Sequence, residues 1–313
     1  MKLAMVFPGQ GSQAVGMLKG YAGLPEIDAT LSEAAATLGD DFVKLLEHGP
    51  ADRLNQTVNT QPAMVTAGYA VYRAWRALGG PAPQMAAGHS LGEYTALVAA
   101  QAIAFRDCLP LVRLRAQAMQ EAVPEGQGAM AAILNLDDAQ VIAACAEASK
   151  TGAGPVQAVN FNSPGQVVIA GEKAAVARAI EACKARGAKR ALPLPVSAPF
   201  HSSLMQPAAQ RLAGHLQNVA VAAPRFSVLN NVDARVENDP ERIKDALVRQ
   251  AASAVRWVET IRAMVDTGAT HIVECGPGRV LAGMTKRIAP QIQSLSLSDR
   301  AAVENALRAV KGS

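Results

Sequence analysis

The segment Gly88-His89-Ser90-Leu91-Gly92 restricts the possible fold more than any other part of the chain. It follows a short predicted strand, Gln84 to Ala87, and precedes an apolar helix that begins near Leu91. A Gly-x-Ser-x-Gly segment between a strand and a helix is typical of a nucleophile elbow, a sharp turn that lifts a serine hydroxyl out of a sheet. The sequence therefore predicts an α/β fold that presents Ser90 beyond the end of a strand.

The two glycines of this segment permit a turn that larger residues would obstruct. The helix that follows offers backbone N–H groups and a partial positive charge to a developing oxyanion. The alternative interpretation is structural, with Ser90 acting only as the cap of a glycine-bounded helix. The position between a strand and a helix favours the nucleophile.

A serine nucleophile needs a base, and the chain contains five histidines. His89 adjoins the nucleophile but is expected to point elsewhere on a sharp turn. His48 and His215 lie in helix-like or polar stretches, and His271 begins a predicted strand. His201 lies in a loop where the chain re-enters the larger of two predicted domains. We prefer His201 as the base, and a purely structural role for it stays open at this point.

The pattern changes to a compact alternating unit between about residues 129 and 194. Its predicted elements are a strand at 129–134, a helix capped by Asp137 or Asp138, strands at 156–161 and 166–170 joined by a turn at 162–165, a helix at 173–186 and a strand at 189–194. This is the order of a split βαβ, or ferredoxin-like, unit. We expect a small domain, residues 126–195, inserted into a large domain, residues 1–125 and 196–313.

The rest of the chain alternates short apolar strands with helices. Strands are predicted at 3–7, 84–87, 226–230 and 271–275, and helices at 30–38, 63–78, 107–122, 204–218 and 240–250. This alternation indicates an α/β domain with a mainly parallel sheet, in which ligands normally bind beyond the carboxyl ends of the strands.

Composition excludes several other classes of protein. Of the 313 residues, 50% are hydrophobic and 18% charged, as in globular proteins. A net charge of +4 and 4% aromatic residues argue against nucleic-acid binding. The four cysteines are scattered without metal-ligand spacing, no apolar run reaches the roughly 18 residues of a membrane span, and the N-terminus lacks a signal-peptide pattern. We therefore expect a cytoplasmic protein without a metal site or a membrane segment.

The segment Gly9-Gln10-Gly11-Ser12-Gln13-Ala14 follows the first predicted strand and fits a dinucleotide fingerprint. Gly16, Gly20 and Gly23 come after it, so the long helix that would hold a pyrophosphate is poorly supported. We prefer a loop that directs backbone donors toward the active site.

Arg115 stands out because the positions on its face of the predicted helix are apolar, among them Leu111, Ala118 and Met119. Arginine is rarely placed on a buried face without an anionic partner. A snorkelling side chain or a structural ion pair is the alternative to a ligand-binding role. Arg113, in contrast, shares its face with glutamines and is predicted to be solvated.

Several motifs, in this order along nearly the whole chain, resemble the malonyl-CoA:acyl-carrier-protein transacylase family. They are Phe7-Pro8-Gly9-Gln10-Gly11-Ser12-Gln13, Thr60-Gln61-Pro62-Ala63, Gly88-His89-Ser90-Leu91-Gly92-Glu93, Arg115 before Met119-Gln120, Asn160-x-Asn162, Phe200-His201, Gln250 before Val255-Arg256-Trp257, and Glu274-x-Gly276-Pro277-Gly278. The resemblance implies a large α/β-hydrolase-like subdomain with a small ferredoxin-like one.

The resemblance also implies the roles of individual residues. Ser90 is the acylated nucleophile, His201 carries its proton, and the backbone carbonyl of Gln250 orients His201. The backbone N–H groups of Gln10 and Leu91 form the oxyanion hole. By the same comparison, Arg115 binds the free carboxylate of the malonyl group, and Phe200, Asn160, Asn162 and Gln61 are the remaining candidate substrate-binding residues.

One segment departs from the family pattern. After Gln250 the family usually has a leucine and often a proline, whereas this chain continues Ala251-Ala252-Ser253-Ala254. The departure puts the path of this loop in question. Phe200 resembles the malonyl-selecting variants of related acyltransferases and therefore favours malonyl over methylmalonyl.

The expected substrates are malonyl-CoA and the phosphopantetheine thiol of an acyl carrier protein, with no cofactor and with the protein acting as a monomer. Fatty-acid synthesis is the most common setting for this reaction. An α/β serine hydrolase or thioesterase and a non-catalytic carrier-protein docking subunit are the alternatives. Candidate basic residues for docking an acidic carrier protein are Lys184, Arg186, Lys189, Arg190, Lys286 and Arg287.

Overall fold

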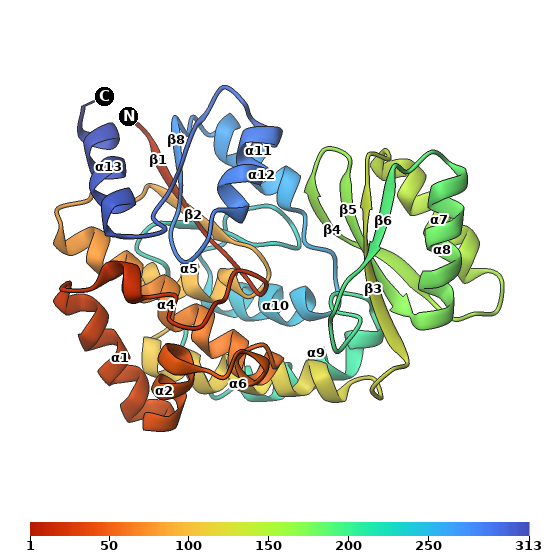
Figure 1. Ribbon diagram of the computed structural model, residues 1–313, viewed down its shortest axis with the longest axis horizontal. Coiled ribbons are helices and arrows are strands. Elements are labelled where there is room, and N and C mark those ends of the chain that lie inside the picture. The colour runs from red at the N-terminus through yellow and green to blue at the C-terminus, as the bar shows by residue number, and fades with distance from the viewer. Residues whose placement is uncertain (313) are drawn as a thin grey trace.

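The computed structural model describes residues 1–312 and contains two sheets in separate parts of the molecule (Figure 1). The larger part holds a parallel sheet covered by helices, and the smaller part, green in Figure 1, holds an antiparallel sheet with two helices on one side. This arrangement confirms the predicted fold class of a large α/β subdomain with a small ferredoxin-like insertion.

The parallel sheet has five strands within the described residues. Their spatial order is β7 (Ser227–Leu229), β2 (Met85–Gly88), β1 (Leu3–Phe7), β8 (His271–Glu274) and β9 (Gln293–Ser296), and all neighbouring pairs are parallel. Phe7 is in register with Gly88 and Val6 with Glu274, so the loops after β1, β2 and β8 emerge at one edge of the sheet. That edge carries Ser90.

The central strand β1 separates two cores, which explains why its sequence is a continuous apolar run. Leu3, Met5 and Phe7 pack on one side against α4 (Thr57–Ala77), α5 (Gly92–Ala99) and α6 (Phe105–Glu121). Ala4 and Val6 pack on the other side against α11 (Trp257–Asp266) and α12 (Val280–Ile288).

Further helices extend the first of these cores. They are α1 (Pro25–Leu38), α2 (Asp40–His48), α3 (Ala51–Leu54), α9 (Gln206–Leu216), α10 (Pro240–Ala251) and α13 (Arg300–Lys311), with short 3-10 turns at Lys19–Tyr21 and Ser203–Met205. Helix α9 packs between α6 and α10, and this stack places the end of α10 beside Ser90. None of the helices in the described chain combines the length and apolar character that a membrane crossing requires.

The small subdomain follows the predicted order of elements. These are β3 (Gly128–Leu134), α7 (Asp138–Ser149), β4 (Val156–Ser163), β5 (Gln166–Glu172), α8 (Lys173–Ala185) and β6 (Arg190–Pro193). The strands form an antiparallel sheet of order β4-β5-β3-β6, and α7 and α8 pack on one face of it. Of the two candidate caps, Asp137 accepts the backbone N–H of Ala139 at the start of α7.

The predicted turn at residues 162–165 is wrong for residues 162 and 163. Strand β4 continues through Asn162 and Ser163, and the turn consists of Pro164 and Gly165, with Gly165 at a φ of +72°. Asn162 is buried because its side chain contacts the large subdomain, which keeps this residue in the strand. Two helices begin earlier than predicted: α1 begins at Pro25 and α4 at Thr57.

Candidate active site

Ser90 lies on the sharp turn between β2 and α5, at a backbone φ of +49° that is uncommon for a residue with a side chain. A methyl group at Gly88 would lie 1.8 Å from the carbonyl carbon of Gly92. A methyl group at Gly92 would lie 2.0 Å from the carbonyl oxygen of Phe7. Both positions therefore require glycine, and the resulting close contacts hold Ser90 in its strained conformation.

The structure brings His201 into contact with Ser90 across 111 residues of sequence. Ser90 Oγ and His201 Nε2 are 2.7 Å apart, and His201 Nδ1 lies 2.9 Å from the backbone carbonyl oxygen of Gln250. Since that carbonyl can only accept a hydrogen bond, Nδ1 carries the proton and Nε2 is free to accept one from Ser90. The Ala251 to Ala254 segment, which departs from the family pattern, leaves this carbonyl in place.

His201 is held in its neutral form. Its side chain is buried, and burial lowers the pKa to about 3, with the positive charge of Arg115 acting in the same direction. His89, the other histidine near the nucleophile, points away: its Nε2 lies 2.7 Å from Asn162 Oδ1, and its ring packs against Trp257. His201 is therefore the histidine that can take the proton of Ser90.

Gln10 and Leu91 carry the two backbone N–H groups that were expected to form the oxyanion hole. Both residues line the cavity at Ser90, and neither N–H has a hydrogen-bond partner in the part of the chain that the structure describes. The loops that carry them lie in close contact, because a methyl group at Gly9 would lie 2.5 Å from the carbonyl oxygen of His89. Paired donors of this kind can hold an oxyanion.

The segment after Gly11 forms turns and the short 3-10 helix Lys19–Tyr21, with no long helix directly after it. It lacks the helix N-terminus that a pyrophosphate would need, as the glycines of this segment indicated.

Arg115 on α6 is 2% exposed and lies beside the nucleophile. Its guanidinium donates to Gln61 Oε1 at 2.9 Å, to Gln250 Oε1 at 2.8 Å and to Ser90 Oγ at 3.3 Å, and it lies 5.4 Å from the centre of the Tyr94 ring. These partners are neutral, and no ion pair to Arg115 is present within residues 1–312. Burial lowers the pKa of Arg115. A buried cation with neutral partners is suited to bind an anionic ligand.

Arg113 was predicted to be solvated and is instead half-buried, with its guanidinium 5.9 Å from the centre of the Phe42 ring. Stacking on an aromatic ring covers its apolar stem, which the polar neighbours in sequence did not reveal.

The cavity at Ser90 has a volume of 140 Å³ and lies between the two subdomains. It is lined by Gln10, Gln61, His89, Ser90, Leu91, Arg115, Met119, Met130, Asn160, Leu194, Val196, Phe200 and His201. The small subdomain contributes Met130, Asn160 and Leu194, and the buried Oδ1 of Asn160 has no partner among the described residues. Two candidates, Asn162 and Gln250, are not among the lining residues. They lie behind the cavity wall, where Asn162 contacts His89 and Gln250 contacts His201.

Sequence reasoning missed two residues that support this arrangement, Glu93 and Asn231. Glu93 is 2% exposed, and its Oε2 accepts hydrogen bonds from Gln250 Nε2 at 2.8 Å and from the backbone N–H of Asn231 at 2.9 Å. Asn231 Oδ1 accepts the backbone N–H of Ser90 at 2.7 Å, and Asn231 Nδ2 donates to the Gly88 carbonyl at 2.7 Å. The network ties the nucleophile turn to the end of α10.

The environment of Glu93 is unusual for a carboxyl group. Burial raises its pKa to about 7, against the lowering effect of its hydrogen bonds from Gln250 and Asn231 and of the charge on Arg115. A charged residue in the otherwise apolar α5 was a signal that could have revealed Glu93. No comparable signal marks Asn231, because it lies in a loop after the short strand β7.

The chain is similar to known proteins over nearly its full length. A profile of the acyl transferase domain matches residues 4–302. The malonyl CoA-acyl carrier protein transacylase of Escherichia coli K12 is 53% identical over 307 residues, which is 98% of this chain and 99% of that one. The Bacillus subtilis protein of the same name is 42% identical over 311 residues, covering 99% and 98% of the two chains.

Solved structures agree with these matches. The acyl-carrier-protein S-malonyltransferase of Burkholderia pseudomallei is 61% identical, with a TM-score of 0.96, and covers 98% of this chain and 100% of its own. A malonyl-transacylase solved in complex with a type II polyketide acyl-carrier protein is 50% identical, also with a TM-score of 0.96, over 99% and 100% of the chains.

Proposed function

The chain belongs to the malonyl CoA-acyl carrier protein transacylase family, and we propose that it transfers a malonyl group from malonyl-CoA to the phosphopantetheine thiol of an acyl carrier protein through an ester on Ser90. The observation that carries the proposal is the position of one oxygen atom. Ser90 Oγ lies 2.7 Å from a neutral imidazole and 3.3 Å from the buried guanidinium of Arg115. A base and a carboxylate-binding group thus meet at one nucleophile.

In the first half of the reaction, Ser90 Oγ attacks the thioester carbonyl of malonyl-CoA and gives its proton to His201 Nε2. The carbonyl oxygen becomes an oxyanion, which the N–H groups of Gln10 and Leu91 stabilise. When the carbon–sulfur bond breaks, the departing thiolate takes the proton from His201. The products are free coenzyme A and malonyl-Ser90.

The second half repeats these steps with another thiol. The phosphopantetheine thiol gives its proton to His201 and attacks the ester, and the Ser90 oxygen leaves and recovers that proton. The same cavity serves both thiols in turn, so double-reciprocal plots should show the parallel lines of a ping-pong mechanism. Intersecting lines would contradict the scheme.

Arg115 would select malonyl by binding its free carboxylate with two charge-assisted hydrogen bonds. The amide oxygens of Gln61 and Gln250 fix the orientation of the guanidinium before substrate arrives. Phe200 and Asn160 line the same cavity and are proposed to contact the acyl group. Asn162 would act through His89 and not by direct contact with substrate.

A serine hydrolase is the rival enzyme, and the surroundings of His201 argue against it. Hydrolases of this type orient the histidine with a carboxylate. Here the backbone carbonyl of Gln250 takes that place, and the buried carboxyl group of Glu93 contacts Gln250 instead of His201. Release of free malonate faster than transfer to carrier protein would favour the hydrolase.

Intact mass spectrometry after mixing with malonyl-CoA tests the proposal directly. The wild type should gain the mass of one malonyl group, and Ser90→Ala should gain none. An unmodified wild type, with Ser90→Ala binding the carrier protein as tightly as the wild type does, would indicate the alternative of a non-catalytic docking subunit.

The proposed partner is an acidic carrier protein, and the structure narrows the set of candidate docking residues. Lys184 and Arg186 already form ion pairs with Glu181 and Glu147. Lys189 and Arg190 on the edge of the small sheet and Lys286 and Arg287 on α12 have no acidic partner among the described residues.

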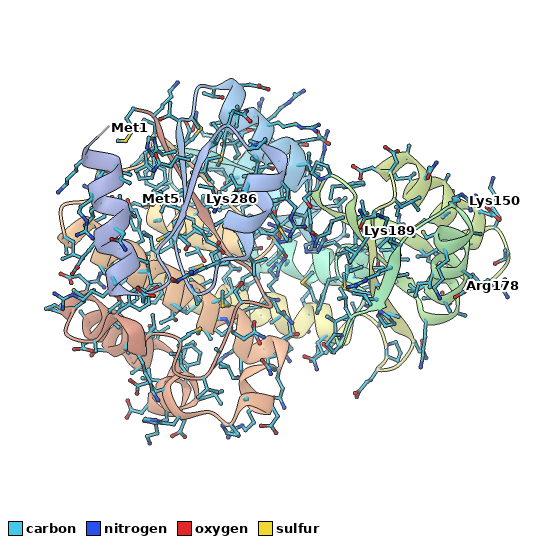
Figure 2. The ribbon with its side chains drawn as sticks, turned by 45° about the horizontal axis from the view of Figure 1, so that its top comes forward. Met1, Met5, Lys150, Arg178, Lys189 and Lys286 are labelled. Atoms are coloured by element: carbon cyan, nitrogen blue, oxygen red, sulfur yellow. The ribbon has the colours of Figure 1, made fainter. Side chains whose placement is uncertain are left out.

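Two of these four residues, Lys189 and Arg287, lie toward the junction of the subdomains. Arg287 donates to Gln166 of β5, which links α12 to the small sheet. Lys189 lies closer to the junction than Lys150 and Arg178, which lie at the far end of the small subdomain (Figure 2). Charge reversal at Lys189 or Lys286 should raise the apparent KM for carrier protein and leave that for malonyl-CoA unchanged.

We further propose that the protein acts in the cytoplasm as a monomer, without a metal or other cofactor. No group of three metal-binding side chains comes together within residues 1–312. The division into residues 1–125 with 196–313 and residues 126–195 is also proposed, since the strands of the antiparallel sheet all lie between Gly128 and Pro193.

A further inference from the structure

A second and larger cavity lies at the opposite edge of the parallel sheet from Ser90. Its volume is 530 Å³. Pro83 in its wall precedes strand β2, and Phe226 directly precedes β7, so the cavity adjoins the amino ends of strands whose carboxyl ends carry the active site. Helix α4 joins the two regions: Gln61 contacts Arg115, and Arg73, twelve residues later, lines the second cavity, about 18 Å further along the helix.

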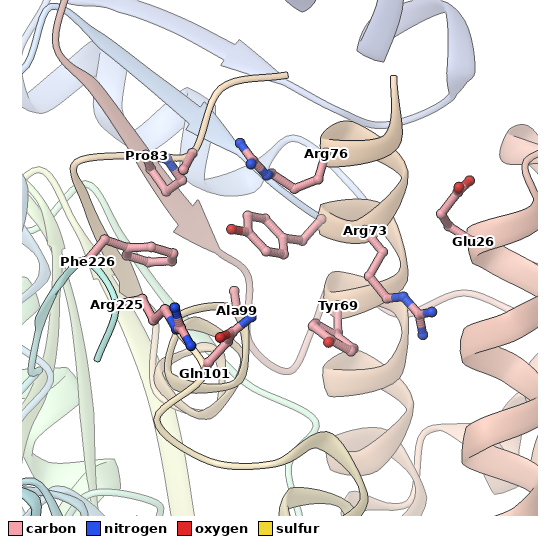
Figure 3. A pocket seen from close by; sticks show the side chains of 11 residues that line it. Glu26, Tyr69, Arg73, Arg76, Pro83, Ala99, Gln101, Arg225 and Phe226 are labelled. Atoms are coloured by element: carbon pink, nitrogen blue, oxygen red, sulfur yellow. The ribbon is translucent and has the colours of Figure 1, made fainter. Parts of the chain in front are cut away.

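The charged side chains of this cavity are mainly cationic. Arg73, Arg76 and Arg225 line it, against one carboxyl group, Glu26. Arg73 forms an ion pair with Glu33 of α1, in which Arg73 Nη1 lies 3.3 Å from Glu33 Oε2. Figure 3 shows Arg73 directed toward α1, whereas Arg76 and Arg225 lie on opposite sides of the cavity.

Arg76 and Arg225 have no carboxylate partner in the described chain. Arg76 donates only to the Gly80 carbonyl oxygen, at 2.8 Å, and none of the described residues accepts a hydrogen bond from the guanidinium of Arg225. Two guanidinium groups in the wall of the cavity therefore keep most of their donors available for an anion.

The remaining wall is partly aromatic. Tyr69, Tyr72 and Phe226 line the cavity together with Ala82 and Pro83. The ring centroids of Tyr72 and Phe226 are 6.4 Å apart and the ring planes are inclined by 59° to each other, so the two rings form neighbouring, tilted parts of the wall. Such a surface provides a face on which a planar ring can stack.

We propose that this cavity binds a nucleotide, with its phosphate groups between Arg76 and Arg225 and its base against the aromatic wall. Guanidinium groups bind phosphate oxygens by paired, charge-assisted hydrogen bonds. Aromatic side chains stack on any of the bases. A volume of 530 Å³ exceeds what an inorganic anion needs and falls within the usual range of about 300 to 1,000 Å³ for small-molecule sites. The proposal does not rest on the transferase activity.

Isothermal titration calorimetry of the full chain with ADP is the primary test, with adenosine and inorganic pyrophosphate as separate probes. ADP should bind at least about tenfold more tightly than either part alone, because it engages both walls. Absence of binding at about 1 mM ADP would overturn the proposal. Pyrophosphate binding as tightly as ADP would also overturn it, since the aromatic wall would then contribute nothing.

Variants separate this cavity from the active site, which could itself recognise the ADP part of coenzyme A. Arg225→Gln removes a side chain without hydrogen-bond partners in the described chain and should weaken ADP binding about tenfold to a hundredfold. The matched control Arg242→Gln, an exposed position on α10, should bind ADP like the wild type.

Arg76→Gln combined with Arg225→Gln should abolish ADP binding and keep the rate of malonyl transfer within about twofold. If this double variant bound ADP as well as the wild type did, the nucleotide site would lie elsewhere and the proposal would be wrong. The melting temperature of each variant shows whether it is folded. If the double variant does not fold, Arg225→Gln alone tests the proposal.

Discussion

The two sides of the active-site cavity are built differently. On the large-subdomain side, the groups that contact Ser90 Oγ are fixed by hydrogen bonds: His201 by the Gln250 carbonyl, and Arg115 by Gln61 and Gln250. The small subdomain contributes Met130, Leu194 and Asn160, and the Asn160 amide oxygen has no partner among the described residues. The base and the guanidinium are thus positioned before substrate arrives, although Arg115 Nε and the N–H groups of Gln10 and Leu91 have no partner among the described residues. The small-subdomain side is mainly apolar, with Asn160 as its one amide.

From this difference we propose that the two subdomains have separate tasks. Preorganised donors and bases lower the barrier to reaction because they need no rearrangement when charge develops. A wall of apolar side chains with a single amide shapes the space for the acyl group instead. Changes on the large-subdomain side should therefore lower kcat, and changes on the small-subdomain side should act mainly on KM.

The largest effect is expected from His201→Ala. Loss of the proton carrier should lower kcat by roughly 10²- to 10⁴-fold while malonyl-CoA still binds, because the Arg115 contacts stay intact. Steady-state kinetics with malonyl-CoA and a carrier protein measure the effect. A variant that retained more than a tenth of the wild-type kcat would remove His201 from the mechanism.

Arg115→Ala should come next, with a loss of about 30-fold to several thousand-fold in malonyl transfer. Acetyl transfer should hold or rise, because acetyl lacks the carboxylate. Arg115→Lys keeps the charge without the planar fork and should restore little activity. Equal losses for malonyl and acetyl would contradict the assignment of Arg115 to carboxylate binding.

Glu93→Gln tests the support behind the catalytic groups. Gln250 Nε2 and Asn231 N donate to the same oxygen of Glu93, so the amide oxygen of the variant can accept both hydrogen bonds but without charge assistance. We expect kcat/KM to fall about fivefold and the free energy of unfolding to fall by about 1 kcal/mol. A purely structural role would lower stability while leaving the ratio of malonyl to acetyl transfer unchanged. A positioning role should reduce that ratio through Gln250 and Arg115.

The raised pKa of Glu93, about 7, gives the same variant a signature in the pH dependence of stability. The folded state binds a proton more tightly than the unfolded state does, so this group lowers stability as pH rises from about 4.5 to about 7. Urea unfolding of wild type and Glu93→Gln across this range should show the decline only in the wild type. Identical profiles would show that the pKa of Glu93 is the same in the folded and unfolded states.

Asn160→Ala should have a small effect on the opposite wall. Its unpaired amide oxygen makes no contact that the resting protein needs, so stability should be unchanged and KM for malonyl-CoA should rise about threefold. A loss in kcat as large as that of Glu93→Gln would end the proposed division of tasks.

The smallest effect is expected from mild acid. Because burial lowers the pKa of His201 to about 3, the imidazole should stay neutral well below the usual histidine range. The kcat/KM profile should therefore show no decline due to His201 between about pH 7 and pH 5. A decline with an apparent pKa near 6.5 would contradict this prediction if it also occurred in Glu93→Gln. The pKa of His201 would then be an ordinary one.

Much of the fold followed from local patterns. The order of elements in the small subdomain could be predicted because each strand and helix is bounded by its own turn or capping residues. The nucleophile turn could be predicted because its glycines are needed at contacts of 1.8 and 2.0 Å, and such positions leave a clear mark in sequence. Asn162 was placed wrongly because its contact with His89 comes from another part of the chain.

The partners of the nucleophile could not be obtained in this way. From its residues alone, the sequence indicated Ser90 as a nucleophile and Arg115 as a buried cation, and it favoured His201 as the base while a structural role for that histidine stayed open. Resemblance to a family gave the same base, and it left Glu93 and Asn231 without roles.

By itself, the sequence determined which segments form strands and helices, where the chain must turn at glycine, and which side chains can carry charge or accept a proton. Only the tertiary structure decided that His201 and Arg115 meet at Ser90 Oγ and that Gln250 contacts both of them. The physical reason is range: turns and capping depend on neighbours in the chain, whereas hydrogen bonds between distant loops depend on how the parallel strands align their carboxyl ends.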